Sequence, residues 1–216
     1  MNLASLTGAL EKLGFDTSLQ TSLNTHISLQ LPKFSISYKA VKERDVLKCN
    51  LFFQRKESGY SCSWYDAILR KEIMIPAISI DAISLEKLDQ EMSLIDWNEI
   101  FHREQNIASI INDLYKLSTN KEGKDYAEQI KVKHWSDTPL EALMNITILK
   151  PRFEISQRFY FMDDTGISIE EAYRFLNNKW MERQQRKKPI ENIVEGITSP
   201  KSKAAKNAKK RNERKG

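Results

Sequence analysis

The spacing of apolar residues changes along this chain, and the change limits the folds that the chain can adopt. In the segments 33–40, 45–53 and 59–68, apolar and polar residues alternate. A period of two is typical of strands that bury one face. Short polar breaks separate the segments, so they predict an antiparallel meander, with residues 73–80 as its fourth strand. Because Pro76 has no backbone N–H, we expect this fourth strand at an edge or a bulge.

Outside the meander, apolar residues recur every three or four positions, which predicts helices. The first helix ends at Gly14, and residues 103–117 carry the strongest apolar stripe of the middle region. Residues 151–161 alternate again as a strand, and a long helix follows from Ile169 to about Lys187.

Together these elements predict an α+β fold in which several helices pack against one face of an antiparallel β-meander. We expect a single globular domain over residues 1–188, since a length of 216 residues suits one large domain better than two small ones. Residues 189–216 have few apolar side chains, and their Lys/Arg-rich composition predicts a disordered tail.

Two adjacent carboxylates, Asp163 and Asp164, lie in the segment FYFMDDTGISIEE and are the first candidates for a metal or catalytic site. A calcium loop of the EF-hand type would require oxygen ligands where Phe161 and Ala172 stand, so the ligand register fails. An acid–base pair requires two carboxylates that converge on one substrate, whereas adjacent side chains in a turn diverge. We therefore predict no metal ligand, cofactor-binding residue or catalytic residue here, and no other segment offers a stronger candidate.

The same segment is typical of a turn that leads from a strand into a helix. Aspartates favour turns, and Gly166 is expected to supply a positive φ. Ser168 and Glu171 have the spacing of a capping box, in which the two residues satisfy each other's backbone donors. We therefore interpret this segment as a structural junction.

The cysteines are not expected to form a disulfide. If the hairpin turns near Ser58, Cys49 faces Asp66 and Cys62 faces Phe53, so the two thiols are not cross-strand partners. Two free cysteines fit a reducing cytoplasm best. The apolar stretches are too short for a membrane helix, and the N-terminus lacks the basic region of a signal peptide, so we expect a cytoplasmic protein without membrane contact.

The histidines and tryptophans leave alternatives open. His26, His102 and His134 lack the spacing of a helical zinc pair, although a site that joins them to a cysteine stays geometrically open. The tryptophans could stack nucleobases in a groove lined by strands. Three of them fall on predicted helices, where anchoring of the core is the commoner role. The four are Trp64, Trp97, Trp135 and Trp180.

The basic C-terminal segment, residues 201–216, gives the clearest functional signal. It contains eight basic residues and one glutamate, a net charge of +7, so the first 200 residues carry −2 of the total of +5. Such a segment can neutralise phosphates, which predicts binding to DNA or RNA without sequence preference. The alternative is a solubilising extension without a specific partner. The predicted contacts are Lys201, Lys203, Lys206, Lys209, Lys210, Arg211, Arg214 and Lys215.

The last third of the chain resembles a known group of proteins. The segments HWSDTPLEAL and EISQRFYFMDDTGISIEEAYRFLNNKWMER, followed by the basic end, resemble uncharacterised proteins carried on conjugative transposons of Bacteroides-type bacteria, most clearly over His134 to Arg183. The resemblance implies a bacterial cytoplasm and a mobile genetic element, and it brings no catalytic residue. We therefore predict a non-enzymatic accessory or interaction protein that contacts nucleic acid or a protein partner. The alternative is an enzyme whose pocket the sequence does not reveal.

Overall fold

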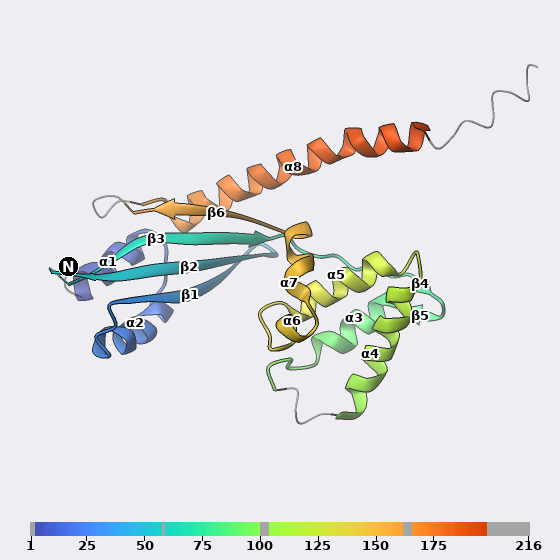
Figure 1. Ribbon diagram of the computed structural model, residues 1–216, viewed down its shortest axis with the longest axis horizontal. Helices are drawn as coiled ribbons and strands as arrows, with labels where there is room; N and C mark the ends of the chain where they lie inside the picture. The colour runs from blue at the N-terminus through green and yellow to red at the C-terminus, as the bar shows by residue number, and fades with distance from the viewer. Residues whose placement is uncertain (1–2, 58, 100–103, 162–165, 198–216) are drawn as a thin grey trace, which may run out of the picture.

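A computed structural model describes residues 3–57, 59–99, 104–161 and 166–197, with side chains except at 104–106 and 187–197. Its elements form an antiparallel sheet with helices in one half of the molecule and a group of helices in the other, which confirms the predicted α+β class (Figure 1). The chain leaves the sheet after its third strand, builds the second group of helices, and returns to add the fourth strand.

The main sheet has four strands in the order β1-β2-β3-β6, and each neighbouring pair is antiparallel. The strands are β1 (Lys33–Lys42), β2 (Asp45–Lys56), β3 (Gly59–Arg70) and β6 (Glu154–Tyr160). The first three confirm the predicted meander. The predicted fourth strand at residues 73–80 is wrong, because only β4 (Ser79–Ile80) forms there, and it pairs with β5 (Ile83–Ser84) in a separate small sheet.

Strand β6 takes the place predicted for residues 73–80 because its apolar side chains match those of β3. Phe159 pairs with Tyr65, and Ile155 pairs with Leu69, on the face that the helices cover. Residues of the earlier segment cannot form the same ladder, since Pro76 has no N–H to donate.

Three helices cover one face of the sheet, and they meet it in a hydrophobic core (Figure 1). They are α1 (Leu3–Lys12), α2 (Ser18–Ser28) and α8 (Ile169–Ile197). Alternate residues of β2 and β3 point into this core and are fully buried, as the period of two requires. They include Leu47, Cys49, Leu51, Tyr65, Ala67 and Leu69. Each buried leucine contributes about 2 kcal/mol of transfer free energy.

Helix α8 continues to Ile197, beyond the end predicted near Lys187. Among the side chains described along this helix, Leu176 is the last that is buried. The apolar pattern therefore marks where the helix leaves the core rather than where the helix ends.

The middle helices form a second hydrophobic core of their own. They are α3 (Leu85–Ser93), α4 (Glu104–Thr119), α5 (Lys124–Trp135), α6 (Leu140–Leu143) and α7 (Ile146–Leu149), followed by a 3-10 turn, η2 (Lys150–Arg152). Their apolar faces are buried against one another, so the helices that cover the sheet are α1, α2 and α8. We call residues 71–153 the helical lobe. The assignment of residues 1–188 to one domain stays a prediction.

Ser168 caps α8 as the sequence predicts. The Glu171 N–H donates to Ser168 Oγ at 3.2 Å, and the Ser168 N–H donates to Glu171 Oε2 at 2.9 Å. The Ser168 hydroxyl also donates to Glu171 Oε2 at 2.7 Å, and this bond, together with that from the Ser168 N–H, lowers the pKa of Glu171. Asp163 and Asp164 lie outside the described residues.

The role predicted for Gly166 is wrong, because its φ does not lie in the left-handed region. The glycine is required for space instead. A Cβ at this position would lie 2.9 Å from Cδ1 of the Phe161 ring, closer than carbon atoms approach one another. Without a Cβ, Gly166 leaves room for the ring of Phe161, which packs against the core.

Replacing the cap in Ser168→Ala should lower the free energy of unfolding by about 0.5–2 kcal/mol. Ser109→Ala is the matched control, since Ser109 is exposed within α4, and alanine there should leave stability unchanged or raise it slightly. Denaturant midpoints of the two variants and the wild type measure the effect. Equal midpoints for Ser168→Ala and the wild type would refute the cap.

Candidate nucleic-acid interface

The second face of the sheet, which we call the open face, lies opposite the core of α1, α2 and α8. One cross-strand row on this face runs over all four strands. It pairs Ser35 with Phe52, Phe52 with Trp64, and Trp64 with Tyr160. Phe52, Trp64 and Tyr160, which we call the aromatic row, thus stand side by side although they come from different parts of the chain.

The rings of the aromatic row contact one another. The Phe52 and Trp64 centroids lie 5.2 Å apart at an interplanar angle of 24°, and those of Trp64 and Tyr160 lie 6.4 Å apart at 53°. Tyr160 remains 61% exposed, whereas Phe52 and Trp64 are half-buried. Exposed aromatic rings on a sheet are surfaces on which nucleobases stack.

A cation lies directly beside the aromatic row. The guanidinium of Arg158 stands 5.1 Å from the centroid of the Trp64 ring. Its Nε and Nη2 donate to the two carboxylate oxygens of Asp66 at 2.7 and 2.9 Å. This pairing raises the pKa of Arg158 further above its already high value. Arg158 is therefore charged at every working pH and held in one orientation.

The open face is more basic than the composition of residues 1–200 suggests. Lys33 and Lys39 point from it, and neither forms an ion pair with another described residue. The strands also place on this face the cations Lys48, Lys56, Arg70 and Arg158 and the carboxylates Asp66 and Glu154. Basic side chains outnumber acidic ones there, so the face favours an anionic ligand.

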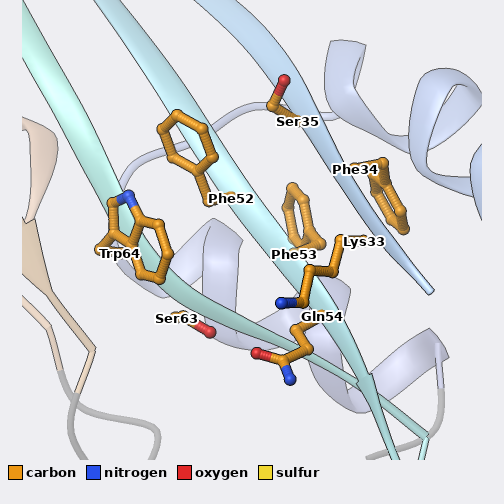
Figure 2. A pocket seen from close by; sticks show the side chains of 8 residues that line it. All are labelled: Lys33, Phe34, Ser35, Phe52, Phe53, Gln54, Ser63 and Trp64. Atoms are coloured by element: carbon orange, nitrogen blue, oxygen red, sulfur yellow. The ribbon is translucent and has the colours of Figure 1, made fainter.

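A hollow of about 340 Å³ opens on this face next to Phe52. Figure 2 shows the Phe52 and Trp64 rings on one side of it and the polar ends of Lys33 and Gln54 on another. Trp64 lies beside the Phe52 ring with its own ring nearly parallel to it, whereas Ser35, the partner of Phe52 on β1, has a small side chain. The hollow therefore borders an aromatic surface that no large side chain occupies.

A β-bulge in β3 helps to shape this hollow. The register shifts between Phe52, which pairs with Trp64, and Phe53, which pairs with Cys62, so Ser63 is the extra residue. Cys62 therefore faces Phe53 as predicted.

Beyond the bulge the register differs by one residue from the prediction, so Cys49 faces Ala67 rather than Asp66. Both thiols are free and buried, and burial raises the pKa of each to about 12.

A cluster of charges joins the other end of the open face to the helical lobe. Asp137, after α5, forms ion pairs with Lys48 at 2.9 Å, with Lys150 at 3.5 Å and with Arg70 at 3.7 Å. Arg70 also pairs with Glu154 at 3.4 Å. We call these residues the charged joint. The cavity between them measures about 30 Å³, room for about one water molecule.

The pKa directions in the charged joint follow from burial and pairing. Burial alone would raise the pKa of Asp137, but the Lys48 hydrogen bond and the charges of Lys150 and Arg70 outweigh it and lower that pKa. Burial prevails at Glu154 and raises its pKa despite Lys150 and Arg70. Since each charge has a partner, the cluster serves to hold the lobe on the sheet.

Asp137→Asn should lower the free energy of unfolding by about 1.5–3 kcal/mol at pH 7, because it removes a charge with hydrogen-bonded partners. Asparagine tolerates the left-handed backbone at this position, where φ is 63°. Because folding lowers the pKa of Asp137, the stabilisation is complete above the unfolded pKa of about 4. The difference from the wild type should therefore shrink as the pH falls below about 4.

The matched control is Asp125→Asn, since Asp125 is 71% exposed and pairs with Arg152 on the surface. That variant should lose less than about 1 kcal/mol. Urea unfolding of both variants between pH 7 and pH 3 gives the comparison. Two outcomes would contradict the role of the charged joint. In the first, both variants lose the same free energy of unfolding at pH 7; in the second, the loss in Asp137→Asn is as large at pH 3 as at pH 7.

The histidines do not gather into a site. His134 Nε2 and Asp89 Oδ1 lie 2.7 Å apart, and Lys133 pairs with the other oxygen of Asp89. Burial lowers the pKa of His134 in spite of this carboxylate. His26 stacks on Phe34 at 4.8 Å, and His102 falls outside the described residues. In the described part of the chain, no three His, Cys, Asp or Glu side chains are grouped to hold a metal ion.

The tryptophans lie in different surroundings. Trp97 and Trp135 are buried in the helical lobe, where their rings meet edge to face at 5.6 Å. Trp180 is only partly buried on α8 and lies against Arg183. Trp64 alone stands on the open face.

Sequence reasoning missed Phe52 and Tyr160, which are the cross-strand partners of Trp64. The available signal was an aromatic residue at a position that alternates with core residues. The eight predicted contacts from Lys201 to Lys215 all lie outside the described residues.

Comparison with known proteins identifies no relative: no protein-family model, no curated protein and no solved structure matches the chain. The resemblance to proteins of conjugative transposons therefore stays a prediction. Within the described residues, no helix combines the length and apolar character that a membrane crossing requires.

Proposed function

We propose that this chain is a non-enzymatic protein that binds single-stranded nucleic acid on the open face of its sheet. The observation that carries the proposal is the aromatic row, three contacting rings in one cross-strand register with Arg158 beside them. Single strands expose the faces of their bases, and duplexes do not, so a stacking surface selects for single strands.

The positive charge of the open face favours nucleic acid over an uncharged ligand. Lys33 and Lys39 lie on the open face without ion-pair partners among the described residues, so they are available to phosphates at no cost in broken pairs. Each phosphate contact releases counterions and adds salt-dependent affinity. An aromatic peptide would gain from the rings but not from these cations.

The basic segment 201–216 fits the same function. Its charge of +7 attracts phosphates without regard to sequence, while the open face supplies contacts to bases. The resemblance to proteins of conjugative transposons makes an accessory role on a mobile element the setting that we propose. Two free, buried cysteines agree with a cytoplasmic location.

The charged joint is the feature that would favour an enzyme instead. Clustered charges with shifted pKa values are common at active sites, but they also occur in structural ion-pair networks. Here the charges pair with one another, and the cavity of about 30 Å³ has room for water rather than a substrate. We therefore prefer the binding function.

Phe52→Ala and Tyr160→Ala should each weaken binding to a fluorescently labelled single-stranded decanucleotide. Stacking contributes about 1–3 kcal/mol per base, which corresponds to a loss of roughly 5- to 150-fold in affinity. Tyr115→Ala is the matched control, because Tyr115 is 68% exposed on α4 and Tyr160 is 61% exposed. Fluorescence anisotropy at fixed salt gives the affinities, and thermal melting confirms that each variant is folded.

An equal loss from Tyr115→Ala, or no loss from either variant of the aromatic row, would refute the open face as the interface. Binding of a proline-rich peptide without binding of the oligonucleotide would identify a protein partner instead.

Removal of residues 201–216 should separate the contribution of the basic segment to binding from that of the open face. The truncated chain should lose most of its duplex binding, because duplexes are held by the eight cations of the segment. It should retain single-strand binding with a shallower salt dependence, and full engagement of eight cations would account for a log–log slope of roughly −6. A salt series on both chains tests this. Unchanged duplex affinity after truncation would contradict the role of the segment.

A further inference from the structure

The hollow beside Phe52 has the arrangement of a site for one base, and we call it the base slot. The Phe52 ring lines one side of it, and the neighbouring Ser35 is a small side chain. Lys33 and Gln54 are direct cross-strand partners and close one end. A base that stacks on Phe52 would therefore present its edge to an ammonium group and an amide.

The polar groups of the base slot are free to bind. The side chains of Lys33, Gln54, Ser35 and Ser63 form no hydrogen bond with another described residue. Lys33 and Gln54 are both exposed, so their polar ends are accessible to a ligand. These groups supply mainly donors, because an ammonium only donates, and an amide both donates and accepts.

Donors of this kind discriminate between base edges. Guanine, uracil and thymine carry a ring carbonyl next to a ring N–H, which matches the amide of Gln54 and offers the carbonyl oxygen to Lys33. Adenine and cytosine place an amino group at the equivalent position, where it would meet the ammonium donor against donor. We propose that the base slot selects keto bases, that is guanine and uracil or thymine, over adenine and cytosine. This inference rests on the proposed function of the open face.

The sharpest test compares dU10 with dC10, because uracil and cytosine have the same ring size and differ at the edge that the slot would contact. The full-length protein should bind dU10 more tightly by about tenfold, the typical discrimination of a good two-point contact. Lys33→Ala should reduce this ratio towards one, whereas Gln54→Ala should lower both affinities, because an amide can rotate to match either edge. Lys39→Ala is the control, since Lys39 lies on the same strand outside the slot and should lower both affinities while the ratio is unchanged.

The outcomes separate the two proposals. Equal binding of dU10 and dC10 by the wild type would overturn the base slot and leave the open face as a general stacking surface. A ratio that survives in Lys33→Ala would also overturn it. Binding of neither oligonucleotide at low salt would overturn the proposed function itself. Because both substituted residues are exposed, the variants are expected to fold, and a melting curve for each verifies this.

Discussion

The charged joint fixes the helical lobe to one end of the sheet and thereby decides which part of the open face stays accessible. Arg70 ends β3 and is only 8% exposed, and a buried guanidinium without partners would be strongly destabilising. Its partners, Asp137 and Glu154, both lie far from Arg70 in the sequence. Their pairing brings the lobe and β6 to the same end of β3. The aromatic row lies further along the sheet, where Trp64 in the middle of β3 pairs with Tyr160 at the end of β6.

The same strands carry structure on one face and the proposed function on the other. Leu51 and Tyr65 bury their side chains under the helices, while their neighbours Phe52 and Trp64 stand on the open face. The Asp66 carboxylate holds Arg158 over Trp64, so this part of the surface is ordered before any ligand arrives. Such pre-organisation reduces the entropy lost on binding.

Patterns of neighbouring residues predict individual strands and helix caps, but they do not predict which distant strands pair with one another. Alternation identifies the first three strands, and capping chemistry identifies Ser168, because both depend on neighbours in sequence. The pattern of residues 73–80 predicts the fourth strand of the meander, and β6 takes that place, because an apolar alternation does not say which strand it will join. The aromatic row could not be predicted for the same reason, because Tyr160 meets Trp64 only through the register of β3 with β6. Gly166 shows a further limit, because its role depends on the ring of Phe161.

The most direct test of the account is a titration of the ¹⁵N-labelled protein with unlabelled dU10, followed through the indole Nε1–H signals in a heteronuclear NMR spectrum. We predict that the Trp64 signal shifts as the oligonucleotide binds. The signals of Trp97 and Trp135 should stay in place, because these indoles are buried in the helical lobe away from the aromatic row. Binding detected by anisotropy with no change at Trp64 would contradict the account, because the ligand would then be held elsewhere on the chain.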